Sequence, residues 1–271
     1  MTLHDDSRST KDNEFRFTPR AGLEAVKDYF IGLKSGETFH YRQGSDREPS
    51  FFRDIGSYLM SSYFYLVVSG LIAVVVSLII GAWQAKSKQE WAKDMLGFLG
   101  VIPDFILVLL LQLAVVSVYQ STGIHVAKVA SSSTDNPAIL LPIITLSVIP
   151  VIYLIRTLSE QTFEVLTEDY ILTAKSKGIS RLSIYIQHVF RNIIPSLKAD
   201  LHKIAAIMMG NLFIVEYLYN TRGVTGLMFI EGDYQYNLIV NGLLTLVILY
   251  LFFYWSMRLF VFGLERIFAY E

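Results

Sequence analysis

Two carboxylates lie inside apolar sequence. Asp104 follows Pro103 and precedes a Leu- and Val-rich stretch, and Glu216 ends the uncharged run 204–215. Burying an ionisable group among apolar residues is costly, so such a group usually faces water or a polar partner. We expect both carboxylates to border a polar path that favours a cationic or zwitterionic solute. The competing interpretation is structural: Asp104 bonds backbone groups freed by the proline, and Glu216 lies at an interface or pairs with Arg222.

A second group of polar side chains lies between residues 163 and 193, a segment that we call the elbow. Apolar residues recur there at three- and four-residue steps before and after Gly178, which predicts two helices joined at a sharp break. Gly178 suits a left-handed residue that ends the first helix, and the Ser180 hydroxyl can cap the second. Asn192 and Pro195 are expected to end that second helix. The following charged residues are expected on the side opposite the apolar face: Glu168, Asp169, Lys175, Lys177, Arg181 and Arg191.

No pattern predicts catalysis or metal binding by this chain. It has no cysteine, and it lacks both the G-x-x-x-x-G-K-[ST] phosphate loop and the G-x-S-x-G nucleophile pattern. The five histidines lack the spacing of metal ligands, and Met208 and Met209 beside Gly210 fit packing better than a metal site. A net charge of −1 provides no basic field for nucleic acid. We predict a non-enzymatic protein with no cofactor of its own.

The elements that position these groups are predicted to cross a lipid bilayer. Hydrophobic residues make up 53% of the 271 residues and charged residues 17%, and the charges are segregated from long apolar stretches. A spanning helix needs about 20 mostly apolar residues. Five stretches qualify, at about 57–83, 95–120, 137–156, 201–220 and 238–262. The sequence therefore predicts an all-α polytopic membrane protein, with a polar N-terminal segment (1–55) before a transmembrane domain (56–265).

The positions of Lys and Arg predict the orientation of the spans, because cytoplasmic loops are enriched in these residues. Twelve of them fall on the side that holds loop 157–200 and the C-terminus, whereas Lys128 and Arg222 fall on the other side. We therefore expect loop 157–200 and the C-terminus in the cytoplasm and residues 1–55 outside.

The N-terminal segment is predicted to contain one amphipathic helix. Leu23, Val26, Phe30 and Leu33 recur at helical spacing before Gly36. We favour packing of this helix on the membrane domain over ligand binding. A long polar segment without a hydrophobic leader must also reach the outer side. We therefore expect a first membrane helix to be missing from the chain, the alternative being a long tail that translocates behind the span at 57–83.

The elbow resembles the EAA loop of ABC-importer permeases, and most closely that of the dipeptide, oligopeptide and nickel branch. The matching residues, in order, are Asp169-Tyr170, Thr173-Ala174, Lys177-Gly178, His188, Arg191-Asn192 and Pro195. The similarity extends over nearly all of residues 20–265, and it includes the turn at 102–105 and Glu216 followed by Gly223. The sequence departs from the branch at 222–225, where Arg-Gly-Val-Thr replaces the usual Pro-Gly-x-Gly, and the family's first membrane helix is absent.

The resemblance implies a permease subunit of an ATP-driven importer with a type I permease core. The assembly would contain two cytoplasmic ATPase subunits, a second permease and an external substrate-binding protein, with ATP and Mg²⁺ bound by the ATPases. The residues that it assigns to ATPase coupling are Glu168, Asp169, Tyr170, Thr173, Ala174, Lys177, Gly178, His188, Arg191, Asn192 and Pro195. Short peptides are the expected cargo, and nickel or another small solute is the alternative. An ATP-independent transporter or channel and a membrane scaffold stay open as other classes, and nucleotide-dependent uptake would discriminate between them and the importer.

Overall fold

The computed structural model describes residues 19–42, 49–84, 90–131, 136–229 and 235–269. Within these residues the regular elements are helices, apart from one isolated bridge between His40 and Ser50. Predictions for residues 1–18 and 85–89 lie outside the described part of the chain. The expected all-α fold is confirmed, and five helical segments of the described chain are long and apolar enough to cross a membrane.

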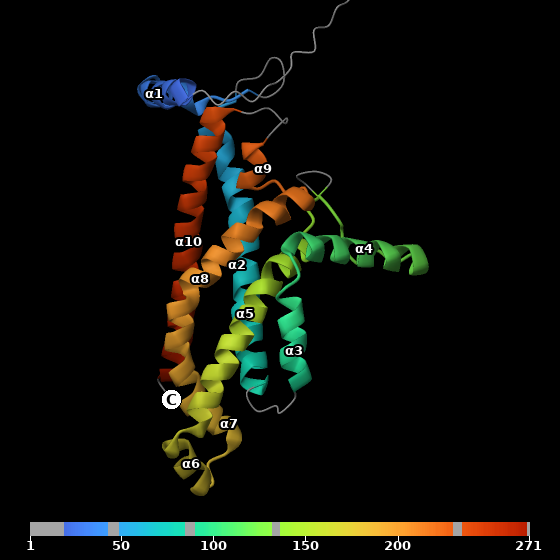
Figure 1. Cartoon of the computed structure of the whole chain (residues 1–271), viewed down its shortest axis with the longest axis vertical. Helices are drawn as coiled ribbons and strands as arrows, with labels where there is room; N and C mark the ends of the chain where they lie inside the picture. Colours follow the sequence, from blue (N-terminus) through green and yellow to red (C-terminus); the bar gives the residue numbers. More distant parts are fainter. Residues whose placement is uncertain (1–18, 43–48, 85–89, 132–135, 230–234, 270–271) are drawn as a thin grey trace, which may run out of the picture.

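In Figure 1 the chain begins at the upper end of the molecule, reaches the elbow at the lower end after more than one passage along the bundle, rises again, and descends through its last helix. In chain order they are α1 (Pro19–Ser35), the 3-10 turn η1 (Glu37–Phe39), α2 (Phe51–Gln84), α3 (Glu90–Leu99), α4 (Asp104–Thr122), α5 (Leu140–Thr167), α6 (Asp169–Ser176), α7 (Arg181–Ile184), the π-helical turn η2 (Tyr185–Phe190), α8 (Arg191–Leu218), α9 (Val224–Met228) and α10 (Tyr236–Ala269).

Helices α2, α5, α8 and α10 form the bundle that holds the core (Figure 1). Small residues on α2 allow the close approach, as is typical of membrane helices. A Cβ at Gly70 would lie 2.9 Å from the sulfur of Met257 on α10, and one at Gly81 would lie 3.1 Å from the Cβ of Leu158 on α5. A side chain at either position would require its neighbours on the facing helix to shift.

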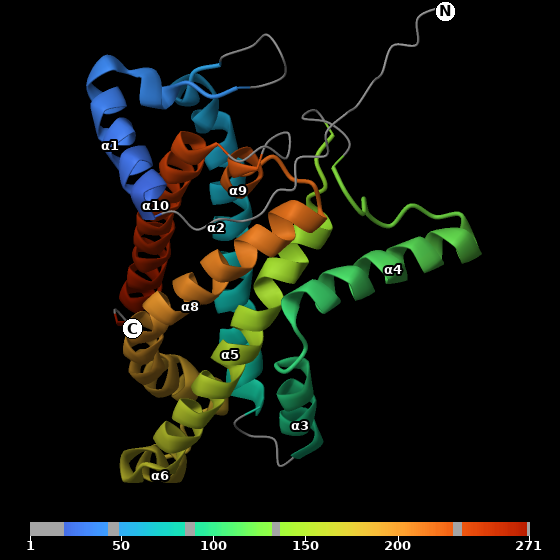
Figure 2. The same cartoon turned by 45° about the horizontal axis from the view of Figure 1, so that its top comes forward.

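The prediction of one continuous helix over 95–120 is wrong. Helix α3 ends at Leu99 and α4 begins at Asp104, with a turn between them. Pro103 explains the break, because it has an extended conformation (ψ 142°), donates no backbone hydrogen bond and disfavours helix in the residue before it. Beyond the turn, α4 leaves the bundle sideways (Figures 1 and 2), and among its residues only Val108 is buried.

The prediction that Asn192 and Pro195 end a helix is also wrong, because α8 continues through both residues to Leu218. Pro195 leaves the carbonyl of Arg191 without its intrahelical donor. Arg191 and Pro195 are both exposed, so water can donate to that carbonyl. The predicted fourth span is therefore the distal part of one helical segment that starts at Arg181.

Candidate functional site

The elbow forms the lower end of the molecule in Figure 1. Its local geometry follows from two residues that the sequence analysis identified. Gly178 is left-handed, with φ +76°, and the Ser180 Oγ accepts a 3.2 Å hydrogen bond from the backbone N–H of Ser183. Both predictions are confirmed. A second break occurs at Glu168, which is extended (ψ 144°), so Phe163 belongs to the end of α5 rather than to the first elbow helix.

A small apolar cluster holds the two arms of the elbow together. Ile171 and Ala174 on α6 and Ile184 on α7 are buried against one another, and Leu166 at the end of α5 packs on them. The cluster fixes the angle that the glycine turn creates. Ala174, one of the predicted coupling residues, therefore contributes to the interior of the elbow.

Three further residues of the predicted coupling set contact one another across the elbow. The Nδ2 of Asn192 donates to the Tyr170 hydroxyl at 3.1 Å and to the carbonyl of His188 at 2.7 Å. The rings of Tyr170 and His188 lie 5.8 Å apart. Burial raises the pKa of the Tyr170 phenol, and the nearby charge of Glu168 raises it further. These contacts join α6 to the start of α8 and make the elbow one stiff unit.

The other predicted residues lie on the surface or at helix ends. Asp169 is in the first turn of α6, and Lys177 follows the last turn. Both charges therefore interact favourably with the dipole of the helix. The Thr173 hydroxyl donates to the carbonyl of Asp169 at 3.0 Å within α6. Arg191 is exposed at the start of α8.

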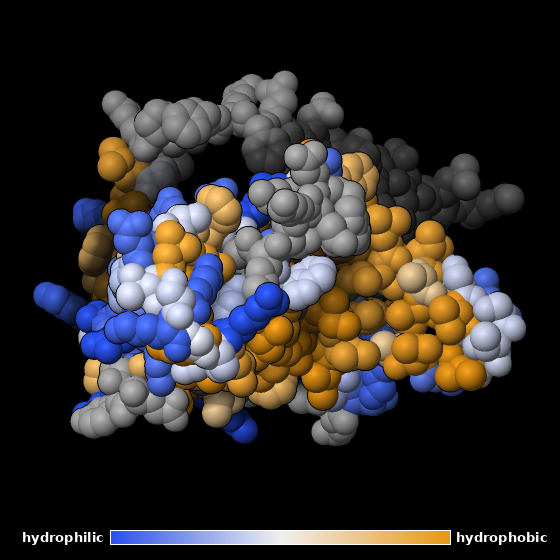
Figure 3. Space-filling model, turned by 90° about the horizontal axis from the view of Figure 1, so that it is seen from below, coloured by the Kyte–Doolittle hydropathy of each residue, from blue (hydrophilic) through white to orange (hydrophobic). Residues whose placement is uncertain are grey.

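Sequence reasoning missed the exposed apolar side chains at the tip of the elbow. Leu172 and Leu182 protrude, and Leu182 has 71% of its surface exposed. Exposed leucines among charged residues are typical of a surface that binds a protein partner. Figure 3 shows hydrophilic residues gathered over this end, with apolar side chains between them and on the arm formed by α4.

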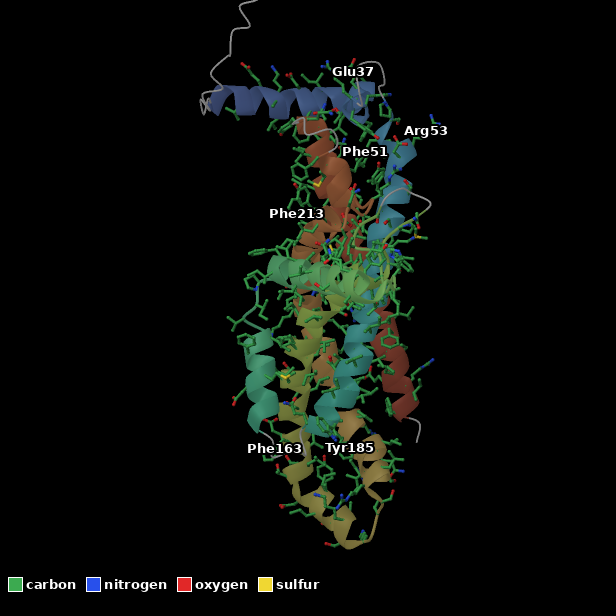
Figure 4. The ribbon with its side chains drawn as sticks, turned by 90° about the vertical axis from the view of Figure 1, so that its right-hand side faces the viewer. Glu37, Phe51, Arg53, Phe163, Tyr185 and Phe213 are labelled. Carbon is green, nitrogen blue, oxygen red and sulfur yellow. The ribbon has the colours of Figure 1, made fainter. Side chains whose placement is uncertain are left out.

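The elbow is attached directly to the membrane bundle. The Tyr185 hydroxyl donates to the carbonyl of Ala82 at the end of α2 at 3.3 Å, and the rings of Phe190 and Phe268 lie 5.1 Å apart. Figure 4 shows Tyr185 at the lower end of the bundle, where α2 meets the elbow. The elbow therefore contacts α2 and α10 in addition to continuing into α8.

Glu216 is buried, with 1% of its surface exposed, and it anchors α9. Its carboxylate accepts hydrogen bonds from the hydroxyls of Ser62 and Thr225 and, at 2.9 Å, from the Thr225 backbone N–H. Ser62 in turn accepts from the N–H of Val224 at 2.9 Å. The exposed Arg222 is not its partner. In this conformation Glu216 therefore lines no open surface.

Asp104 is half-buried at the first turn of α4. Among the described residues its carboxylate has no hydrogen-bonding partner, so the structure does not reproduce the proposed bonding to backbone groups. Its charge favours the N-terminal end of the α4 dipole. The two carboxylates therefore differ, because that of Glu216 accepts hydrogen bonds and that of Asp104 has no partner among the described residues.

A cavity of about 680 Å³ lies at the end of the bundle opposite the elbow. Aromatic rings of Tyr58, Phe64 and Tyr65 line it together with Asn220 and Arg222. A guanidinium among aromatic and hydroxyl groups can bind a carboxylate-bearing solute. Among the described residues there is no group of three or more His, Asp or Glu that could hold a metal ion.

A helical bundle with five segments long and apolar enough to cross a membrane, and with an exposed elbow at one end, defines a multi-pass membrane protein. The family described as the inner membrane component of binding-protein-dependent transport systems matches residues 73–269, which is more than half of the chain. The chain belongs to this family. It is therefore a multi-pass membrane protein and a non-catalytic permease component, as the sequence analysis predicted.

Named relatives support the same branch. A dipeptide transport system permease of Bacillus subtilis is 27% identical over 216 residues, which cover 78% of this chain and 68% of that protein. A putative peptide transport system permease of Brucella suis is 30% identical over 167 residues, which cover 58% and 52%. The chain spans between about half and two thirds of the length of these relatives. A chain of the MetNI methionine ABC transporter, in an inward-facing conformation, overlaps 78% of this chain and 94% of its own length at 14% identity, with a TM-score of 0.49.

Proposed function

We propose that this chain forms part of the translocation path of an ATP-driven importer of short peptides and that the elbow receives the motion of a partner ATPase. The observation that carries this proposal is the braced elbow, in which Asn192 bonds to Tyr170 and to His188 while Leu172 and Leu182 protrude. An ATPase can move a membrane helix only through an element that is stiff and firmly docked, because a flexible loop would absorb the displacement.

The partners follow from the family and from the charge distribution. We infer two ATPase subunits on the cytoplasmic side, which bind ATP and Mg²⁺, a second permease beside this one, and an external substrate-binding protein. The excess of Lys and Arg around the elbow supports a cytoplasmic position for it and for the C-terminus, and an external position for α1. Peptide cargo is supported by the named relatives, which are peptide permeases.

Docking of the ATPase is tested by a charge at the tip of the elbow. Leu182→Asp leaves the core intact because the side chain is exposed, but it places a carboxylate in the docking surface. Val126→Asp, at an exposed apolar residue of the loop after α4, is the matched control. We expect the ATPase to co-purify with wild type and with the control, and at least tenfold less with Leu182→Asp. Equal recovery of the ATPase with all three proteins would exclude docking at this surface.

Cargo and path are tested by uptake of a labelled dipeptide into proteoliposomes that contain the whole assembly. Asp104 and Arg222 are candidates to attract the ammonium and the carboxylate of a zwitterionic peptide, because neither has a charged partner among the described residues. We expect Asp104→Asn and Arg222→Gln to raise the KM for the dipeptide several-fold, with Glu216→Gln altering stability instead. Nickel uptake in place of dipeptide uptake would favour the alternative cargo, and uptake without nucleotide would favour an ATP-independent transporter.

A further inference from the structure

Helix α1 is fixed to the membrane bundle along one face. The hydroxyl of Tyr29 donates to the Oδ1 of Asn241 on α10 at 2.8 Å, and the Nδ2 of Asn241 donates to the carbonyl of Thr38 at 2.9 Å. The Thr38 hydroxyl closes the triangle by donating to the carbonyl of Tyr29 at 3.0 Å. At Gly32 a Cβ would overlap the Thr38 hydroxyl. These buried contacts set both the position and the rotation of α1.

The helix runs across the end of the bundle rather than along it. Figures 1 and 4 show α1 nearly perpendicular to α2 and α10, with its N-terminal part extending beyond them. Its contact residue Asn241 lies in the second turn of α10. Since α10 is a membrane-spanning helix, α1 lies parallel to the membrane plane near the level where that span enters the bilayer.

The rotation of α1 separates three faces. With about 100° between successive residues, the anchoring face holds Tyr29 and Gly32. An exposed apolar stripe lies next to it, formed by Leu23, Val26, Phe30 and Leu33, of which Leu23 and Phe30 are 71% and 65% exposed. Lys27 and Lys34 lie along the border of this stripe. The opposite face carries the polar residues Glu24, Asp28 and Ser35, and the exposed Ile31 (58%) lies between these residues and Lys27.

Large apolar side chains are also exposed on α10 beyond its contact with α1. Leu243, Leu244 and Val247, just beyond Asn241, are exposed on that membrane-spanning helix. A stripe of large apolar residues, bordered by lysines and opposed by an acidic face, is the pattern of a helix that lies in the membrane interface. Lysine side chains at such a border extend their ammonium groups to the level of the lipid phosphates.

We propose that α1 is an interfacial helix whose partner is the phospholipid bilayer: its Leu23, Val26, Phe30 and Leu33 side chains enter the acyl region, and Lys27 and Lys34 bind lipid phosphates. Because α1 is held at the bilayer surface, it fixes the depth and tilt of α10 in the membrane through the Tyr29–Asn241 hydrogen bond. Its bilayer contact is a property of the chain itself and does not depend on the solute that the permease carries.

The absence of cysteine from the sequence makes a direct test possible, because single cysteines can be introduced without removing others. We would attach a nitroxide at Leu23→Cys and Phe30→Cys on the stripe and at Glu24→Cys and Asp28→Cys on the polar face. All four sites are exposed, so the fold does not depend on them. The full chain is reconstituted in vesicles of phosphatidylethanolamine and phosphatidylglycerol, and collision of each nitroxide with oxygen and with a water-soluble relaxation agent is measured.

The proposal requires the two stripe sites to collide with oxygen at least several-fold more than with the aqueous agent, and the two polar sites to show the reverse. Stripe sites that collide freely with the aqueous agent would place α1 in water, and stripe sites protected from both agents would place it against a protein. Either result overturns the proposal. For the lysines, replacing both Lys27 and Lys34 by Gln should reduce the immersion of Phe30→Cys more in vesicles with phosphatidylglycerol than in vesicles of phosphatidylcholine alone. No effect in either vesicle would remove phosphate binding from the proposal, because both lipids carry a phosphate and only phosphatidylglycerol adds a net negative charge.

Discussion

The carboxylate of Glu216 occupies the space where any side chain at residue 223 would stand, so that position accepts only glycine in this conformation. Gly223 has φ −108°, which any residue can adopt, so its requirement is space and not backbone freedom. The close approach lets the carboxylate reach Thr225, just inside the short helix α9. The glutamate and the glycine thus form one anchor between α8 and α9.

We predict that Gly223→Ala destabilises the protein. The new methyl group displaces the Glu216 carboxylate, and the buried N–H and hydroxyl of Thr225 lose their acceptor. A buried polar group without a partner costs about 1–3 kcal/mol. Gly226→Ala is the matched control, because its Cβ would lie at an ordinary 3.4 Å from the nearest atom, the carbonyl of Thr221. Thermal unfolding in detergent should show a lower Tm for Gly223→Ala alone, and equal Tm values for the two variants would contradict the anchor.

The glycine turn of the elbow gives a second prediction. Gly178→Ala places a Cβ on a left-handed residue, which costs about 1–2 kcal/mol, and no atom lies within 4 Å of that Cβ. Gly123→Ala imposes the same strain, with φ +74° and equally open surroundings, at the C-terminal end of α4, away from the elbow. We expect nucleotide-dependent uptake to fall about five- to tenfold for Gly178→Ala and to stay near wild type for Gly123→Ala. A similar loss in both variants would mean that general destabilisation, and not the elbow angle, limits transport.

The hydrogen bond between Asn192 and Tyr170 gives a third prediction. Tyr170→Phe keeps the ring beside His188 but removes the hydroxyl, and Asn192→Ala removes the donor. Each exposed hydrogen bond is worth about 0.5–1 kcal/mol. We expect each single variant to weaken the stimulation of ATPase activity by peptide-loaded binding protein, with no loss of bound ATPase. The double variant should be no worse than the poorer single variant, since both remove the same bond. Strictly additive effects would show that the two residues act separately.

Local rules explain which features of the elbow were predictable. The glycine turn and the serine cap depend on residues within a few positions of each other, so Gly178 and Ser180 were assigned correctly. The contact between Tyr170 and Asn192 joins residues 22 positions apart and depends on how α6 folds back on α8. Helical spacing likewise places Leu182 on one face of a helix, but it does not say whether another element covers that face.

The number of spanning segments was predicted correctly, but the effects of Pro103 and Pro195 were not. The five apolar stretches predicted five spanning segments because hydropathy depends on composition alone. The effect of a proline depends on its surroundings: Pro103 breaks the chain between α3 and α4, whereas Pro195 lies inside α8. The role of Glu216 was open for a similar reason, because its partners Ser62 and Thr225 come together only in the folded bundle.

The phenol of Tyr41 provides a prediction about pH. Tyr41 is buried at the N-terminal side of α2, and its hydroxyl donates to the Oδ2 of Asp54 at 2.9 Å. Burial and this hydrogen bond to the carboxylate raise the pKa of Tyr41 well above its usual value of about 10. A group whose pKa is raised in the folded state stabilises that state fully below its unfolded pKa. The contribution is lost as the pH rises, because above about pH 10 the unfolded chain releases the proton while the folded chain keeps it.

We therefore expect the contribution of Tyr41 to the Tm in detergent to be constant between pH 7 and 9 and to fall as the pH rises above about 10. Tyr41→Phe should lower the stability at pH 7 by about 1 kcal/mol through the lost hydrogen bond, and its deficit should shrink toward pH 11. Tyr217→Phe, at a side chain that is 73% exposed, controls for the removal of a phenol as such. A deficit for Tyr41→Phe that stays constant from pH 7 to pH 11 would show that Tyr41 keeps its proton equally well in the folded and unfolded chains. The buried hydrogen bond to Asp54 would then contribute nothing to the alkaline limit of stability.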